Sequence, residues 1–224
     1  MRAMFDRIAG FYDVMNSVMT AGLHHAWRRR AVELARVGPG DRVLDVATGT
    51  GDLALELAAR VAPGGAVIAS DFSEEMLIRA RAKGDGAPVA VTFEWANAMQ
   101  LPYGDGEFAA ATVGFGARNF SDLDRGLREM TRVVRPGGSV VVLEITTPTR
   151  RPLSTFYRLW FDRVVPVIGK LAGDQEAYSY LPNSVKRFPG PHELAARMHA
   201  CGLDVRYILT AGGIIALHAG TKRA

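Results

Sequence analysis

The residues best suited to chemistry in this chain lie between positions 43 and 52. An apolar run ends in Asp45, glycines follow at Gly49 and Gly51, and a helical pattern begins at Leu53. In open α/β sheets, a strand that runs into a glycine turn and a helix brings backbone close to a nucleotide or nucleoside. The third glycine of the dinucleotide pattern G-x-G-x-x-G is absent, so that fingerprint is incomplete.

A second acid, Asp71, closes the next apolar run at 66–70. A carboxylate at the end of a second strand suits a ribose diol, because it can accept both hydroxyl hydrogens. Together the turn and the acid predict a nucleoside site, and S-adenosylmethionine is the ligand that best fits the shortened turn. The alternative is a purely structural strand–helix turn with an acidic N-cap.

The elements that must position these residues alternate as strand and helix, which favours a largely parallel sheet with helices on both faces. The helix at 122–134 has Ser121 as its predicted N-cap. Residues 135–138, Arg-Pro-Gly-Gly, are predicted to end that helix and turn the chain into the fifth strand. The predicted strands are 42–46, 66–71, 89–94, 108–114 and 138–145, and the predicted helices are 51–62, 74–83, 122–134 and 191–200.

The end of the chain reads differently, because residues 203–209 and 214–219 flank a glycine pair and predict a hairpin with an antiparallel member. Two segments lie outside the alternation: residues 1–37, predicted to be helical, and the connection 147–190. So long a connection usually carries function or helices of its own. We expect a single domain over 1–224, with both segments covering the carboxyl edge of the sheet.

Composition fits one such domain in a reducing compartment. The chain has 224 residues, of which 48% are hydrophobic, and a single cysteine, Cys201. It therefore has no internal disulfide or multi-cysteine zinc site, and we expect no metal. No apolar run is long enough to span a bilayer, and Asp6, Arg7 and Asp13 interrupt any signal-peptide core. We therefore expect a cytoplasmic protein, whose net charge of +4 decides nothing alone.

With these pieces placed, the chain resembles the class I S-adenosylmethionine-dependent methyltransferases, and more narrowly the C-methyltransferases of menaquinone and ubiquinone biosynthesis. The broad resemblance rests on the glycine turn, Asp71, Leu101-Pro-Tyr103 and the 135–138 turn. The narrow one covers nearly the whole chain and rests on residues 12–16, 27–28, 96–98, 115–119, 143–145, 178–181 and 216–220. It implies a Rossmann-like, doubly wound, mostly parallel seven-stranded sheet with a helical cover.

The resemblance also implies a cofactor site for S-adenosylmethionine, with S-adenosylhomocysteine as the product. Thr50 matches the threonine of the family's glycine turn, and Asp71 matches its ribose acid. Asn97 and Ala98 match the pair expected beside adenine. Gly114 stands where some members have Ser, so a hydroxyl contact is absent there. The implied set is Asp45, Gly49, Thr50, Gly51, Asp71, Asn97, Ala98 and Gly114.

Methylation of a ring carbon requires a reduced quinone whose hydroxyl loses its proton, so the site needs a proton acceptor and a partner for the phenolate. Arg118 is the predicted partner, because its guanidinium can stabilise an oxyanion; alternatively it braces a loop carboxylate. Asn119 could orient the same oxygen or act as a local cap. Tyr12 and Asp13 match a family motif and are candidate bases. Histidines 24 and 25 are further candidate bases, and Glu144 is either another candidate or the partner of Arg118.

The predicted function is methylation of a prenylated naphthoquinol, demethylmenaquinol to menaquinol. The alternatives are a polyprenyl benzoquinol of ubiquinone biosynthesis, an unrelated small acceptor, or a non-catalytic S-adenosylmethionine-binding subunit. We expect peripheral association with the inner face of the membrane, with the arginines at 28–30, 150 and 151 either near anionic headgroups or forming a solvated face. No nucleic-acid partner is expected, and a homodimer stays open.

Overall fold

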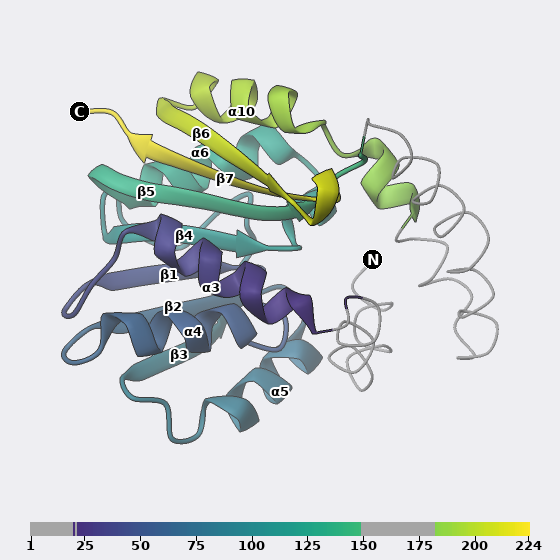
Figure 1. The fold of residues 1–224 in the computed structure, drawn as a ribbon. Helices are drawn as coiled ribbons and strands as arrows, with labels where there is room; N and C mark the ends of the chain where they lie inside the picture. The colour runs from purple at the N-terminus through teal and green to yellow at the C-terminus, as the bar shows by residue number, and fades with distance from the viewer. Residues whose placement is uncertain (1–19, 21, 149–181) are drawn as a thin grey trace, which may run out of the picture.

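The computed structural model describes residues 20, 22–148 and 182–224, which form one sheet flanked by helices (Figure 1). The candidate bases Tyr12 and Asp13, and the arginines at 150 and 151, lie outside the described residues. Most of the expected cover at 1–37 and 147–190 lies outside them as well, so the cover over the carboxyl edge stays a prediction.

Seven strands form the sheet, in the order β3-β2-β1-β4-β5-β7-β6. β7 pairs antiparallel with both β5 and β6, and the other neighbouring pairs are parallel. This confirms the predicted mostly parallel sheet with an antiparallel member near its end. The strands are β1 Arg42–Val46, β2 Ala66–Asp71, β3 Ala90–Trp95, β4 Phe108–Gly114, β5 Val134–Ile145, β6 Leu203–Thr210 and β7 Ile215–Lys222.

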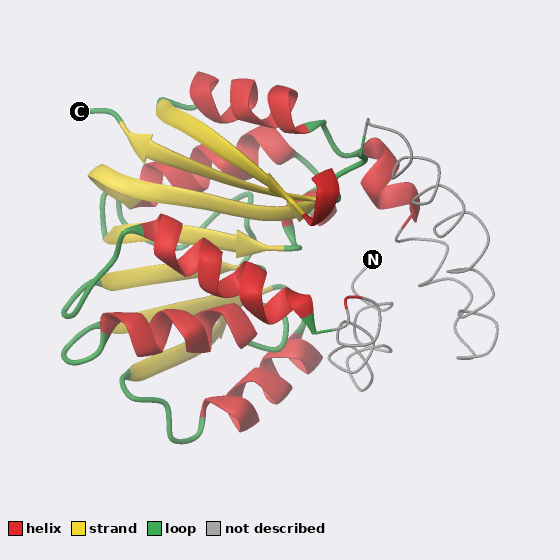
Figure 2. Ribbon diagram, in the orientation of Figure 1, coloured by secondary structure: helices red, strands yellow, loops and turns green. Residues whose placement is uncertain are grey.

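Helices cover both faces of the sheet, with α3, α4 and α5 on one face and α6 and α10 on the other (Figures 1 and 2). Neighbouring strand residues divide between the two layers, since Val43 packs in the core under α3 and α4 whereas Leu44 packs in the core under α6 and α10. The helices are α3 Leu23–Ala35, α4 Asp52–Val61, α5 Glu74–Gly84, α6 Leu123–Val133 and α10 Pro191–Ala200, with short 3₁₀ turns η1 Ala117–Asn119 and η3 Ala211–Gly213.

Two local expectations differ from the structure. The N-cap of α6 is Asp122, whose side chain accepts from the Arg125 N–H, rather than Ser121. Both residue types cap well, and the chain enters the helix one residue later than predicted. The Arg-Pro-Gly-Gly stretch lies inside β5, because Val134 already pairs with Phe108 and the register shifts before Ser139 pairs with Ala110. It is therefore a bulge in the strand rather than a turn ahead of it.

The strand order places the glycine turn at the switch point of the sheet. The chain runs outward from β1 through β2 to β3, and then returns to β4 on the other side of β1. Ligands of open α/β sheets bind at the carboxyl ends of the strands where the order reverses. Asp45, Asp71 and Gly114 lie at or near those ends of β1, β2 and β4, so the topology brings the predicted cofactor residues to one edge.

Candidate active site

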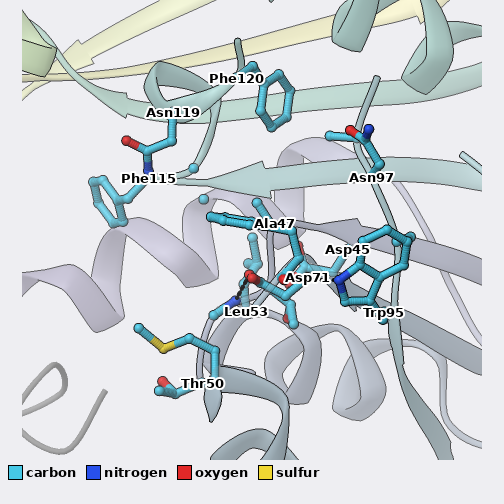
Figure 3. Close-up of a pocket in the computed structure, with 18 of the residues that line it drawn as sticks. Asp45, Ala47, Thr50, Leu53, Asp71, Trp95, Asn97, Phe115, Asn119 and Phe120 are labelled. Carbon is cyan, nitrogen blue, oxygen red and sulfur yellow. Dashed lines mark hydrogen bonds between the residues drawn. The ribbon is translucent and has the colours of Figure 1, made fainter. Parts of the chain in front are cut away.

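A cavity of about 400 Å³ opens at this edge (Figure 3). It has the size typical of sites for small molecules and cofactors. Its lining comes from the ends of β1, β2, β3 and β4, from the loops that follow them, and from α3, α4 and α5. Its polar or partly polar lining residues include Asp45, Thr50, Asp71, Trp95, Asn97 and Asn119, and Leu53, Phe72, Met76, Phe115 and Phe120 give it apolar walls.

The glycine turn needs its glycines for two separate reasons. Gly49 and Gly51 both have positive φ, 58° and 86°, which side chains with a Cβ rarely adopt. At Gly51 a Cβ would also lie 3.0 Å from the Phe93 ring, so the close approach of α4 to β3 depends on its absence. Gly51 is the N-cap residue of α4 and is not among the residues that line the cavity. Its predicted role in the cofactor site is therefore to shape the turn.

Asp71 connects the second strand to the glycine turn. One carboxylate oxygen accepts from the Gly49 N–H at 2.8 Å, and the other accepts from the Ser73 N–H at 2.9 Å. A carboxylate offers about four acceptor positions, so these two bonds do not exhaust it. The side chain lines the cavity with its orientation fixed at both oxygens, as a ribose diol would require.

Asp71→Ala is expected to weaken binding of S-adenosylhomocysteine by roughly 10- to 150-fold, the factor for losing a charged hydrogen-bond acceptor. Part of this loss is expected to come from the glycine turn, since the Gly49 N–H loses its partner too. Calorimetric titration measures the affinity, with Asp85→Ala as a control, because Asp85 is exposed and does not line the cavity. An unchanged affinity in a folded Asp71→Ala protein would remove Asp71 from the site.

Asn97 and Ala98 line the cavity beyond the end of β3, where adenine was expected. The Asn97 side-chain oxygen accepts from the Met99 N–H at 3.0 Å, and its backbone oxygen accepts from the Gln100 N–H at 2.8 Å. The loop is thus held by its own hydrogen bonds. A carbonyl oxygen has two lone pairs, so Asn97 keeps acceptor capacity toward a ligand.

A network of ion pairs connects the start of α4, just after the glycine turn, to α3 and α5. Asp52, the first residue of α4, pairs with Arg28 at 3.0 Å and with Lys83 at 2.7 Å. Lys83 also donates to the Thr50 hydroxyl at 3.0 Å, and Arg28 Nη1 lies 2.5 Å from His24 Nδ1. Arg28 is buried and lines the cavity, which is a correction to its expected place near lipid headgroups.

Asp45 lies buried beneath the turn. Its two carboxylate oxygens accept from the hydroxyls of Thr48 and Thr112, each at 2.6 Å. Burial raises the pKa of Asp45 to about 6, although the two hydroxyl bonds and the charge of Arg28 act in the opposite direction. Asp45 therefore lines the cavity with its carboxyl group fixed by the two threonine hydroxyls, close to the glycine turn.

Arg118 precedes the lining residue Asn119 and is held by other groups of the protein. Its Nη1 forms a 2.6 Å ion pair with Glu144 and donates to the carbonyl of Phe115 at 2.5 Å. The second Glu144 oxygen accepts from the Arg118 backbone N–H at 3.2 Å. Both side chains are buried, with 8% of Arg118 and 1% of Glu144 exposed. Arg118 is not among the described lining residues, so the structure gives it the bracing contact, with Glu144 as the carboxylate.

Some of the predicted site residues line the cavity, and others do not. Those that line the cavity are Asp45, Gly49, Thr50, Asp71, Asn97, Ala98, Gly114 and Asn119. Gly51 and Arg118 are not among its lining residues; Gly51 caps α4, and Arg118 pairs with Glu144. Four aromatic lining residues were not predicted as site residues from the sequence: Phe72, Trp95, Phe115 and Phe120. Position in the chain was the available signal. Phe72 and Phe115 directly follow strands that end in a predicted site residue, Trp95 ends the strand that precedes Asn97, and Phe120 follows Asn119.

Within residues 20, 22–148 and 182–224, no cluster of three or more His, Cys, Asp or Glu side chains is arranged to hold a metal ion. Over the same residues, no helix has the length and apolar character needed to cross a bilayer.

Comparison with known sequences finds one family over nearly the whole chain. Residues 1–222 match the family model of the ubiE/COQ5 methyltransferase family. The demethylmenaquinone methyltransferase of Thermus thermophilus is 46% identical over 98% of this chain and 100% of its own. That of Deinococcus radiodurans is 45% identical over 98% and 91%. The ubiquinone/menaquinone biosynthesis C-methyltransferase UbiE of Geobacter sulfurreducens is 43% identical over 99% and 88%.

Solved structures show the same fold at low sequence identity. A methyltransferase from Thermotoga maritima that depends on S-adenosylmethionine superposes with a TM-score of 0.68 at 20% identity, covering 100% of both chains. Another, from Aquifex aeolicus, gives a TM-score of 0.63 at 18% identity and covers 87% of this chain and 88% of its own. Both comparisons confirm the expected Rossmann-like methyltransferase fold.

Proposed function

This chain belongs to the ubiE/COQ5 methyltransferase family, and from that premise we propose that it methylates a ring carbon of a prenylated naphthoquinol, demethylmenaquinol to menaquinol. S-adenosylmethionine is the methyl donor and S-adenosylhomocysteine the second product. The observation that carries the choice of acceptor is that three relatives at 43–46% identity, over nearly the whole chain, are demethylmenaquinone methyltransferases. Since the family is one of methyltransferases, the non-catalytic alternative is set aside.

A polyprenyl benzoquinol is the second candidate acceptor. It is favoured by relatives named for both ubiquinone and menaquinone biosynthesis, at 39–43% identity. The same chemistry serves both rings, because each needs a deprotonated hydroxyl next to the carbon that is methylated. The two acceptors differ in the second, fused ring of the naphthoquinol.

The residues of the cavity fit S-adenosylmethionine. Asp71, fixed at both oxygens by backbone N–H groups, suits the ribose diol. Asn97 and Ala98 suit the edge of adenine, and Gly49 leaves open space where a Cβ would otherwise stand. When bound, the cofactor supplies a methyl group on a positively charged sulfur. The buried carboxyl group of Asp45 lies close to the turn and can balance part of such a charge.

The protein's work in this reaction is to position the two reactants and keep water out. Phe115 and Phe120 give the cavity apolar walls near its acceptor end, and Asn119 lines the same part (Figure 3). The Asn119 amide is placed to orient the oxygen of the acceptor ring. Arg118 acts as a positioning residue, since it joins Glu144 on β5 to the Phe115 carbonyl and so holds the loop that carries Asn119.

Tyr12 and Asp13 are the proposed proton acceptors, on the basis of the family motif alone. Glu144 is a poorer candidate, because its two oxygens already accept from Arg118 and from the backbone N–H of Ile145. A polyprenyl acceptor is almost insoluble in water, so we also propose that the protein reaches it at the inner surface of the membrane through exposed basic and apolar residues.

The acceptor is tested by steady-state assays with the two reduced, demethylated quinols, measuring S-adenosylhomocysteine by mass spectrometry. We expect kcat/KM to favour the naphthoquinol by roughly 10- to 200-fold, the range over which an apolar pocket discriminates by ring size. Reactions without acceptor give the background. A preference for the benzoquinol would move the protein to the second candidate function, and no turnover with either quinol would refute both.

A further inference from the structure

Trp95 is a large exposed aromatic residue in a position that the fold holds rigid. It ends β3 and is 54% exposed, although it lines the cavity. Its indole N–H donates to the Phe72 carbonyl at 3.0 Å. The next residue along the chain is also fixed, since the Ala96 N–H donates to the Asp71 carbonyl at 3.1 Å. A tryptophan so constrained has little freedom to fold its ring away from water.

The neighbours of Trp95 are the residues that suit ribose and adenine. Trp95 is the register partner of Asp71 on the adjacent strand, and it precedes Asn97 by two residues. Figure 3 shows the indole beside Asp71, on the same side of the cavity as Asn97. In a nucleoside the base is joined directly to the ribose. A ribose held at Asp71 therefore puts its base within reach of the Trp95 ring.

We propose that the indole of Trp95 is the stacking wall for the adenine base, and that it makes the cavity selective for a ligand carrying an aromatic base. The assignment rests on the proposed cofactor. Aromatic rings stack on bases because every base has a flat π face, and the interaction needs no further hydrogen bond. Asn97 and Ala98 then contact the edge of the base, while Trp95 covers its face.

A tryptophan at the membrane surface is the competing explanation for an exposed indole. Interfacial tryptophans keep the apolar ring in lipid and the N–H toward water and headgroups. In Trp95 the N–H is already committed to the Phe72 carbonyl. That bond holds the ring against the carboxyl end of β2, which favours a cavity wall over a lipid anchor.

The test is binding of S-adenosylhomocysteine to Trp95→Ala, Trp95→Phe and wild-type protein, by calorimetry and by tryptophan fluorescence. Trp27→Phe is the matched control, because Trp27 packs edge-on against Phe115 but is not a lining residue. We expect Trp95→Ala to weaken binding roughly 5- to 150-fold, the range for losing one stack between an aromatic side chain and a base. Trp95→Phe should bind within about fivefold of wild type, because a smaller ring still stacks.

Fluorescence supplies the readout that a structural role would not move. Stacked adenine should quench the emission of wild type and Trp27→Phe, and this quenching should disappear in Trp95→Phe although binding persists. Quenching that survives in Trp95→Phe, or unchanged affinity in Trp95→Ala, would overturn the assignment. An emission that responds to anionic vesicles and not to the ligand would do the same. If the wild-type protein does not bind S-adenosylhomocysteine at all, the proposed function itself fails.

Discussion

Methyl transfer is expected only when the acceptor ring is reduced, with no product above background from the oxidised quinone. The reason is chemical. A quinol hydroxyl can lose its proton and push charge onto the neighbouring ring carbon. That carbon would then form a bond to the methyl group while the sulfur leaves with the electron pair of the broken bond, and the ring carbon would lose its hydrogen as a proton. The oxidised ring has no such hydroxyl, and its carbon is electron-poor.

The measurement uses anionic liposomes loaded with demethylated quinone, with and without a chemical reductant, across a salt series. Product should appear only with the reductant. If basic residues draw the protein to the lipid, turnover should also fall as salt rises, since exposed charges are screened beyond about 10 Å at 0.1 M salt. Equal methylation of both oxidation states would refute the mechanism. If turnover and liposome binding do not change with salt or with lipid charge, only the proposed contact between basic residues and anionic lipid is refuted.

The sheet could be predicted from the sequence because its central strands are buried on both faces. Such strands appear as continuous apolar runs with clear ends. The bounds of β1, β2 and β4 were predicted to the residue. The start of β5 was not, because a bulge containing Pro and two Gly looks like a turn when its partner strand is unknown.

The cofactor edge could be predicted for a similar reason, since Asp71 and the glycine turn follow strands whose order is set by a recurrent topology. Contacts between distant residues could not. Arg118 and Glu144 lie 26 positions apart, and the sequence could offer their pairing only as one alternative beside Asp122 as the partner of Arg118. Arg28 is part of an arginine triplet typical of a solvated surface, yet it is buried against Asp52. The roles of Arg118 and Arg28 both follow from their burial. Burial depends on tertiary packing, which the order of residues along the chain does not show.

Arg118→Met is expected to lower the free energy of unfolding by about 3–5 kcal/mol, because it leaves the Glu144 carboxylate buried without its cation. Turnover should fall as well, by roughly 10²-fold, since the loop with Phe115 and Asn119 loses the contact that places it. Denaturant melts and steady-state kinetics with reduced quinol measure the two effects. The affinity for S-adenosylhomocysteine should change little.

The double variant Arg118→Met/Glu144→Gln separates bracing from chemistry. Replacing both partners removes the stranded charge, so stability should return to within about 1–2 kcal/mol of wild type. If the turnover loss of Arg118→Met comes from the stranded Glu144 charge displacing the loop, turnover should return to within about tenfold as well, and the missing bond to the Phe115 carbonyl accounts for what remains. A double variant that regains stability while turnover stays roughly 10²–10³-fold low would show that turnover depends on the guanidinium itself, and not only on relief of the buried charge.

An exposed ion pair of the same length provides the control for these changes. Arg81 and Glu74 are also 2.6 Å apart, but each side chain is 45% exposed. Arg81→Met should therefore cost at most about 1 kcal/mol, because water solvates the glutamate that remains. If Arg81→Met and Arg118→Met destabilise the protein equally, burial is not the source of the Arg118 effect. A large loss confined to Arg118→Met, recovered by Glu144→Gln, is the result expected for a buried brace behind the acceptor end of the site.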